Sequence, residues 1–354
     1  MKFSLFAHME KTSPSQSYKD LHDEFLSICK LAEDGGMHAI WTGEHHCMDF
    51  TIAPNPFITI VDLANKLKSI RLGTGTVIAP FWHPIKLAGE SAMTDIITSG
   101  RLEMGIARGA YSFEYERLMP EMDAWEAGQR LREIIPAVRQ LWKGDYTHKG
   151  EFYSFPKSTS TPKPFQVDGP PIWIAARDPN SHEFAIQNHC NVQVTPLWQE
   201  YKEIQNLINK FDNAKKKYDS ESQSKIMLLQ HTFVSDDANE LDHAAKKFSE
   251  FYAHFGEWFQ NKRPITQASI KKLSQKELAS LDMYAPAIMR ENLLMGTTDQ
   301  VIERLKKYEK LGYDEFSYWI DSGMSYDMKV ASLEHFIKKV IPAFQSQIEQ
   351  YETE

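Results

Sequence analysis

Apolar positions along the chain alternate between short runs, typical of buried strands, and longer stretches with the spacing of an amphipathic helix. Between residues 18 and 34 the apolar side chains recur every three or four positions, which predicts a helix that ends at the glycine pair Gly35 and Gly36. The short apolar run that follows, at 37–42, predicts a strand. The same alternation continues almost throughout the chain and is typical of an α/β protein.

Eight strands are predicted, at residues 2–7, 37–42, 70–79, 101–107, 172–176, 191–195, 225–234 and 314–320. The predicted helices are one that ends at residue 67 and those at 18–34, 86–98, 123–142, 179–187, 199–218, 237–252, 298–310 and 326–345. Eight strand–helix units in 354 residues favour a single (β/α)8 TIM barrel over an open sheet. No Gly-x-Gly-x-x-Gly motif follows the first strand, which argues against a Rossmann fold.

Two segments interrupt the alternation. Residues 146–155 read as a hairpin followed by a proline-rich crossing, and residues 254–292, after the seventh strand, show no strand–helix rhythm. The second segment and the end of the helix before it are rich in aromatic side chains: Phe251, Tyr252, Phe255, Trp258, Phe259 and Tyr284. We therefore expect one barrel domain over 1–354, with 254–292 as an insertion that acts as a lid. The aromatic residues favour an apolar or aromatic ligand, or they pack the lid itself.

Composition limits the classes of partner. Apolar residues make up 42% of the chain, and the formal net charge is −8, so a large core is expected and binding to nucleic acid or an anionic membrane is not. The chain starts with a strand pattern rather than a signal peptide, and no apolar stretch is long enough for a membrane helix. The three cysteines lack metal-binding spacing. A cytoplasmic protein without a metal site is therefore predicted.

Candidate chemistry gathers where the predicted strands end, which is the edge of an α/β barrel that carries active sites. Glu44, His45 and His46 follow the second strand and offer proton-handling groups. A hydrogen-bonded structural pair is the alternative for the two histidines. Four further side chains lie near the ends of other strands and are candidates for a substrate pocket: His8, Trp198, His231 and Trp319.

An anion site is predicted from two segments. Arg108 is followed by a glycine, and its guanidinium suits a phosphate, although a surface ion pair with Glu114 or Glu116 is an alternative. The segment Ala176–Ser181 joins a buried strand to a helix N-terminus, where backbone N–H groups favour an anion. Arg177 and Ser181 would add donors, whereas Asp178 can equally be a plain N-cap. The small residues Gly75 and Thr76 would let a flat ligand approach the backbone.

These motifs together resemble the bacterial luciferase family of flavin-dependent monooxygenases and oxidoreductases. The resemblance covers essentially the whole chain and is carried by five segments in order: Trp-Thr-Gly-Glu-His-His at 41–46, Ile70–Thr74 leading to His83-Pro84, Gly100–Leu102 leading to Arg108-Gly109, Pro162–Pro164 leading to Pro171–Ile174, and Gly296-Thr297 with Gly312–Phe316. It implies a barrel with an insertion near the seventh strand.

The resemblance also implies a cofactor and roles for individual residues. It implies FMN, reduced by a separate NAD(P)H:flavin reductase, and His45 as the catalytic histidine. It places Arg108, Arg177, Asp178 and Ser181 at the flavin phosphate, and a non-prolyl cis peptide at Gly75-Thr76 beneath the flavin ring. A homodimer is implied as well.

The resulting functional hypothesis is the oxygenase of a two-component monooxygenase. It would use reduced FMN and O₂ to oxygenate a small organic substrate, apolar or aromatic, through a C4a-peroxyflavin. Two alternatives are an F420-dependent hydride-transfer oxidoreductase, which shares this barrel by resemblance, and a non-catalytic flavin-binding protein.

Overall fold

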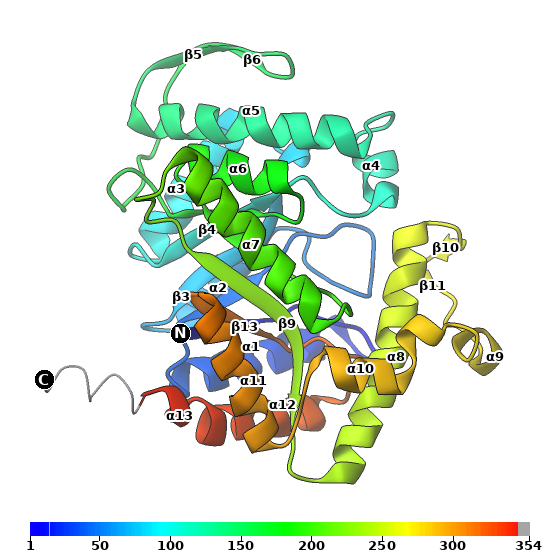
Figure 1. Cartoon of the computed structure of the whole chain (residues 1–354). Coiled ribbons are helices and arrows are strands. Elements are labelled where there is room, and N and C mark those ends of the chain that lie inside the picture. Colours follow the sequence, from blue (N-terminus) through cyan, green and yellow to red (C-terminus); the bar gives the residue numbers. More distant parts are fainter. Residues whose placement is uncertain (14, 346–354) are drawn as a thin grey trace, which may run out of the picture.

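The structure, a computed structural model, describes residues 1–13 and 15–345 and contains a closed barrel of eight parallel strands (Figure 1). In order around the barrel the strands are β1 (Lys2–Phe6), β2 (Ala39–Thr42), β3 (Arg71–Ile78), β4 (Leu102–Ala107), β7 (Ile172–Ala175), β8 (Asn191–Val194), β9 (Ile226–Val234) and β13 (Glu315–Trp319). The last strand pairs with the first, with Trp319 opposite Phe6. The predicted (β/α)8 TIM barrel is confirmed, and all eight predicted strands are present.

Helices form the outer layer of the barrel. They are α1 (Tyr18–Asp34), α2 (Pro56–Lys66), α3 (Pro84–Ile97), α5 (Ala124–Lys143), α6 (Pro179–Gln187), α7 (Tyr201–Tyr218), α8 (Ala238–Gln260), α11 (Thr298–Leu311) and α12 (Tyr326–His335). Helix α1 illustrates the local causes: the Ser17 side chain accepts from the N–H of Asp20 at its start, and the helix ends at Gly35. Apart from α8, whose buried apolar side chains belong to a separate cluster, these helices pack the apolar side chains of their inner faces against the strands in the largest buried cluster.

A smaller cluster fills the inside of the barrel. It consists of Phe6, Ala39, Trp41, Trp173, Met227 and Leu229, with Trp319 packed against it. Side chains of a strand alternate between its two faces, so β1, β2, β7 and β9 each contribute to both the inner and the outer cluster. The barrel interior is therefore a packed core, and ligands have to bind at its end, where the loops lie.

Several elements differ from the sequence-based expectation. Helix α8 runs to Gln260 rather than to residue 252, so the segment without regular structure begins later than predicted; the helix ends at Asn261 in a left-handed conformation with φ 50°. A short helix, α4 (Ser112–Leu118), and a short strand, β12 (Leu294–Gly296), which pairs with β9, were not expected. The predicted helix 326–345 consists of α12, a π-helical segment (Phe336–Val340) and α13 (Pro342–Gln345), because Pro342 interrupts its hydrogen bonding.

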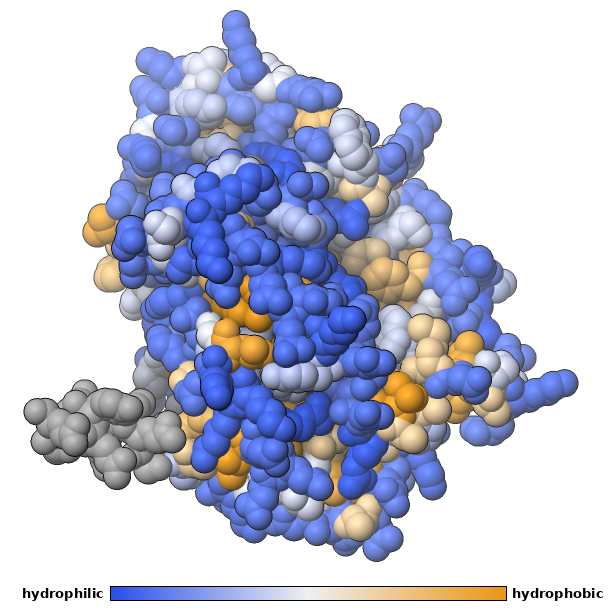
Figure 2. Space-filling model, viewed as in Figure 1, coloured by the Kyte–Doolittle hydropathy of each residue, from blue (hydrophilic) through white to orange (hydrophobic). Residues whose placement is uncertain are grey.

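The remaining elements lie outside the barrel. The predicted hairpin is confirmed as β5 (Tyr146–Lys149) and β6 (Ser154–Ser158), and a short 3-10 helix (Ala79–Phe81) follows β3. The segment after α8 contains β10 (Ile265–Thr266), β11 (Ser269–Ile270), α9 (Gln275–Leu278), a 3-10 turn (Asp282–Tyr284) and α10 (Pro286–Asn292). Figure 1 shows this segment beside α8 at one side of the barrel, and Figure 2 shows hydrophobic side chains over this side as well as over the middle of the same face.

Helix α8 packs against loops at the C-terminal ends of the barrel strands. Phe251 and Phe255 of α8 share a buried cluster with Phe50, Tyr111 and Met324, which follow β2, β4 and β13. The insertion is thereby attached to the edge of the barrel where chemistry is expected. Within 1–13 and 15–345, no helix is both long enough and apolar enough to cross a membrane.

Candidate active site

The carboxylate of Glu44, just beyond β2, is buried and accepts hydrogen bonds from three directions. Its Oε2 atom accepts from the backbone N–H of Ile78 at 2.7 Å and from the indole N–H of Trp82 at 2.9 Å. Its Oε1 atom lies 2.8 Å from Nε2 of His46. This hydrogen bond to Glu44 raises the pKa of His46 above its usual value, although burial of the ring opposes the shift. His46 therefore holds the buried carboxylate in place.

The imidazole of His45 faces different neighbours from that of His46. Its ring centroid lies 5.3 Å from Tyr111 and 6.1 Å from His8, whereas the His46 ring contacts Phe81. Nδ1 of His45 lies 3.4 Å from Oε2 of Glu114. With Nδ1 turned to this carboxylate, Nε2 is the nitrogen that remains to exchange a proton with a ligand.

Glu114, in α4, is a site residue that the sequence pattern did not reveal. Its side chain is 1% exposed, and Oε1 accepts the backbone N–H of His46 at 2.7 Å. The alternative of a surface ion pair between Arg108 and Glu114 is therefore wrong. The guanidinium of Arg108 instead donates to the carbonyl oxygen of Ala124 at 2.9 Å.

His8, after β1, is fixed in one tautomer by its two partners. The backbone N–H of Gly43 donates to Nε2 of His8 at 2.9 Å, so this nitrogen is an acceptor. Nδ1 therefore carries the proton of the neutral ring and donates to Oδ2 of Asp321 at 3.0 Å. Asp321, just beyond β13, also accepts from the indole N–H of Trp319 at 3.0 Å. Burial favours the neutral form of Asp321, but the hydrogen bond from His8 and the nearby charge of Lys329 hold its pKa below the usual value.

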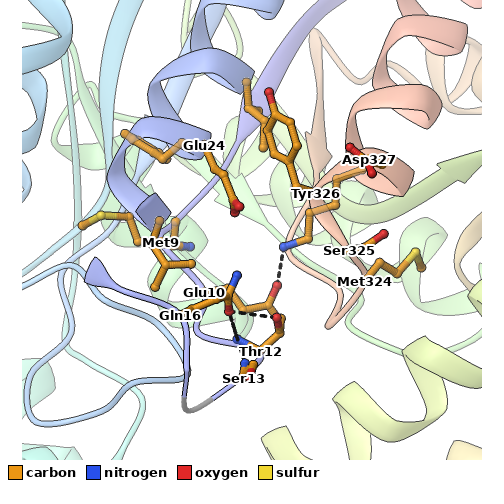
Figure 3. A pocket seen from close by; sticks show the side chains of 15 residues that line it. Met9, Glu10, Thr12, Ser13, Gln16, Glu24, Met324, Ser325, Tyr326 and Asp327 are labelled. Carbon is orange, nitrogen blue, oxygen red and sulfur yellow. Dashed lines mark hydrogen bonds and ion pairs between the residues drawn. The ribbon is translucent and has the colours of Figure 1, made fainter. Parts of the chain in front are cut away.

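A second polar network fixes the loop that follows β13. The carboxylate of Glu10 accepts the backbone N–H groups of Ser322 and Gly323 at 3.1 and 2.7 Å and pairs with Nζ of Lys329 at 2.5 Å. Both ion-pair side chains are nearly buried, at 4% and 10% exposure. They lie beside a cavity of about 440 Å³ between α1 and the start of α12, into which Glu10 and Glu24 point (Figure 3).

Gly75 and Thr76, late in β3, are joined by a cis peptide bond, as the family resemblance implies. A Cβ atom added to Gly75 would lie 2.5 Å from a ring carbon of Phe6, so only glycine fits here. A Cβ atom added to Gly43 would lie 2.8 Å from Nε2 of His8 and 2.9 Å from the carbonyl oxygen of Gly75. The backbone at the ends of β2 and β3 therefore lies too close to its neighbours to leave room for a side chain at Gly43 or Gly75.

His231 and Trp319, both predicted pocket residues, stack on each other. Their ring centroids lie 3.7 Å apart with an interplanar angle of 19°, and Nδ1 of His231 lies 2.6 Å from the hydroxyl of Tyr252. Burial lowers the pKa of His231 to about 3, so its ring is neutral at physiological pH. Trp198 contacts Tyr252 and Tyr284 and lies one layer further out.

These rings belong to a closed series of contacts that we call the aromatic circuit. Neighbouring ring centroids in it lie 3.7 to 6.4 Å apart, and its members, in order, are His45, Tyr111, Phe255, Phe251, His231, Trp319, Phe6 and His8. The circuit brings together residues in β1, β9, β13 and α8 with residues that follow β1, β2 and β4. Two buried carboxylates contact the histidines of the circuit: Asp321 contacts His8, and Glu114 contacts His45.

The predicted anion-binding residues follow two neighbouring strands. Because β4 and β7 pair, with Ile106 opposite Ile174, Arg108 and Arg177 emerge at the same edge of the barrel. Both side chains are exposed, and the nearest carboxylate to Arg177, that of Glu203, lies 3.8 Å away. Both guanidinium groups therefore retain donors for an anion.

The start of α6 shows what Asp178 does in this structure. Asp178 caps the helix: its carboxylate accepts the backbone N–H of Ser181 at 3.1 Å and the Ser181 hydroxyl at 2.6 Å. The N-cap interpretation of Asp178 is thus confirmed, and these bonds keep its pKa below the usual value despite partial burial. Ala176, which follows β7, is buried in the main core.

A family model described as luciferase-like monooxygenase matches residues 1–315 of the chain. The chain belongs to the luciferase-like monooxygenases. The members of this family are monooxygenases, which are enzymes. The resemblance to the bacterial luciferase family seen in the sequence motifs is thus confirmed.

Two individual relatives differ in how similar they are to this chain. The oxygenase component of the flavin-dependent trigonelline monooxygenase of Acinetobacter baylyi is 60% identical over 344 residues, which cover 97% of this chain and 96% of that protein. The alkanal monooxygenase alpha chain of the Kryptophanaron alfredi symbiont is 24% identical over 188 residues, 53% of this chain and 52% of its own.

Solved structures of other monooxygenases have the same fold. RslO1 from Streptomyces bottropensis superposes with a TM-score of 0.79 at 25% identity, covering 97% of this chain and all of that one. The oxygenating constituent of 3,6-diketocamphane monooxygenase from Pseudomonas putida, solved in complex with FMN, gives a TM-score of 0.77 at 17% identity over 97% and 98% of the two chains.

Proposed function

We propose that this protein is the oxygenase component of a two-component, FMN-dependent monooxygenase that acts on trigonelline or a closely related N-methylpyridinium carboxylate. The observation that carries the proposal is the 60% identity to a trigonelline monooxygenase component over nearly the full length of both chains. The identity to an alkanal monooxygenase is far lower and extends over about half of the chain. A substrate of the first kind is therefore favoured over an alkanal.

The aromatic circuit suits the cationic ring of such a substrate. Faces of aromatic rings attract cations, and quaternary ammonium groups are often bound in this way. The buried carboxylates of Asp321 and Glu114 place negative charge directly behind Trp319, His8 and His45. In a site that excludes water this charge favours a positively charged ring over a neutral one.

The residues at the C-terminal ends of β3, β4 and β7 fit FMN. Gly75 and Thr76 are small residues at the end of β3, where the flat ring system would lie, and Arg108 and Arg177 retain donors for the phosphate. The start of α6 follows β7, next to Arg177, and a role of Ala176, Asp178 and Ser181 at the same phosphate is part of this proposal. Reduced FMN, when bound, supplies the chemistry that activates O₂ and oxygenates the substrate.

The protein contributes positioning, proton handling and exclusion of water. Glu114 orients His45 through Nδ1, so that Nε2 acts as the acid–base atom toward flavin and substrate. The insertion at 254–292, together with the end of α8, acts as a lid that keeps water from the reacting groups.

Partners follow from the same proposal. The relative is an oxygenase component, so a separate NAD(P)H:flavin reductase supplies reduced FMN. Helices α2 and α3 pack against each other and expose Ile58, Met93, Ile96 and Ile97, which favours a homodimer through this face. All three cysteines are free thiols, which agrees with the reducing cytoplasm.

The proposal is tested with purified protein, a flavin reductase, NADH and trigonelline under ¹⁸O₂. We expect O₂ uptake coupled to a product that carries ¹⁸O, and its loss in the His45→Ala variant with FMN affinity retained. Hydrogen peroxide as the sole product of O₂ would overturn the substrate assignment. Binding of F420 in place of FMN in a titration would overturn the cofactor assignment and favour hydride transfer. A failure to consume O₂ with any electron source would point to a non-catalytic flavin-binding protein.

A further inference from the structure

A cavity of about 540 Å³ lies beneath α8, between the loop after β1, the segment around Asp49 and the β10–β11 hairpin. Two phenylalanines and a histidine form one wall: Phe50 lies 4.9 Å from Phe251 and 5.4 Å from His254, measured between ring centroids. Phe251 is also a member of the aromatic circuit, where it contacts His231. The cavity is therefore separated from the candidate active site by a single layer of aromatic side chains.

His254 offers a buried donor without a partner. The indole N–H of Trp258 donates to Nε2 of His254 at 3.2 Å, so this nitrogen is an acceptor. Burial, reinforced by the charges of Lys272 and Arg263, lowers the pKa of His254 to about 4, so the ring is neutral and its proton resides on Nδ1. Among residues 1–13 and 15–345, no atom forms a hydrogen bond with this buried Nδ1. Buried donors are rarely left unpaired, and His254 is one of the residues that line the cavity.

The charges around the cavity favour an anion of charge one. The carboxylate of Glu10 is already paired with Lys329, and Nζ of Lys247 lies 2.9 Å from Glu250. Lys11 and Lys272 remain, opposed by Asp49 alone, which leaves one positive charge in excess. The ammonium of Lys272 has a single weak contact, 3.3 Å to the carbonyl oxygen of Thr12, and can turn to a ligand.

We propose that this cavity is a binding site for aromatic carboxylates and receives the substrate carboxylate on its way to the flavin. His254 Nδ1–H and the Lys272 ammonium bind the carboxylate, and the rings of Phe50 and Phe251 contact the aromatic ring. The identification of the ligand as the substrate rests on the proposed function; the preference for an aromatic carboxylate rests on the cavity alone.

The first experiment compares trigonelline with its carboxamide analogue, N-methylnicotinamide, which keeps the cationic ring and lacks the carboxylate. In the His254→Phe and Lys272→Gln variants we expect KM for trigonelline to rise on the order of tenfold, because a charge-assisted hydrogen bond is lost. The values of kcat and the KM for the carboxamide should change little. The Lys271→Gln variant removes an exposed lysine that does not line the cavity and is the matched control.

Equal effects of the variants on trigonelline and carboxamide, or no effect on either, would overturn the site. Calorimetry with nicotinate and trigonelline, in the absence of turnover, separates the site from the proposed function. If the wild-type protein does not oxygenate trigonelline but binds nicotinate, and the Lys272→Gln variant binds it more weakly, the site stands and the substrate assignment fails. If the wild-type protein binds neither carboxylate, the site is wrong whatever the enzyme oxygenates.

Discussion

Replacing Lys329 with methionine tests whether the network behind the aromatic circuit stabilises the fold. The substitution keeps most of the side-chain volume and removes the ammonium that pairs with Glu10 at 2.5 Å. With the two side chains at 10% and 4% exposure, the carboxylate left behind cannot be rehydrated without opening the loop after β13. Breaking a buried pair from one side costs about 3–5 kcal/mol. Because Ser322 and Gly323 still donate to Glu10, we expect about 3 kcal/mol, at the lower end of that range.

The assay is urea-induced unfolding at pH 7, followed by tryptophan fluorescence, with the Lys338→Met variant as control. Lys338 pairs with Glu334 on the exposed face of α12 and the π-helical segment, so its removal should change the unfolding free energy little. The double variant Glu10→Gln with Lys329→Met should recover part of the loss, since no unpaired buried charge remains. A loss for Lys329→Met no larger than that of the exposed control would refute the reasoning.

Three further predictions concern the site. Because the pKa of His46 is raised in the folded state, the protonated ring paired with Glu44 stabilises the fold fully below about pH 6.5, and this stabilisation is lost as the pH rises through the folded-state pKa. In the Glu44→Gln variant the free energy of unfolding should therefore change less with pH in this range. The Gly75→Ala variant should bind FMN more weakly in a fluorescence titration and lose about 1–3 kcal/mol of unfolding free energy, because the added Cβ atom meets the ring of Phe6. The Gly144→Ala variant, whose added Cβ atom has nothing within 4 Å, should show neither effect. The Trp319→Leu variant should raise KM for trigonelline several-fold, matching about 1 kcal/mol of cation–π attraction, and an unchanged KM would exclude the circuit from substrate binding.

The fold could be predicted from the sequence because its strands and helices carry the appropriate periodicity locally. Strand β9 is buried along its whole length and begins with the apolar run Ile226–Leu229, and the glycine after α1 marks the end of that helix. The extension of α8 to Gln260 could not be predicted in this way. Its last turns, from Ala253 to Trp258, are buried beneath the loops around them, so tertiary packing rather than an amphipathic pattern maintains the helix.

The candidate site was predicted in part. Strand ends indicated His8, His45, His231 and Trp319, and the structure brings these four side chains into one circuit. The buried carboxylates were missed. The sequence indicated Glu114 only as a surface ion-pair partner of Arg108, and Asp321 follows the last strand like an ordinary turn residue. Glu114 contacts His45, which is 69 positions away in the sequence, and Asp321 contacts His8, which is 313 positions away. A local sequence pattern does not reveal such contacts.

The contact between His8 and Asp321 has a consequence for when the enzyme acquires its activity. These residues follow the first and the last strand of the barrel and are separated by 313 positions, so their hydrogen bond cannot exist before the final strand–helix unit is in place. The same bond presents the His8 ring to Gly43 and sets it beside His45. A chain still emerging from the ribosome therefore cannot assemble this part of the site, which forms only when the last strand closes the barrel.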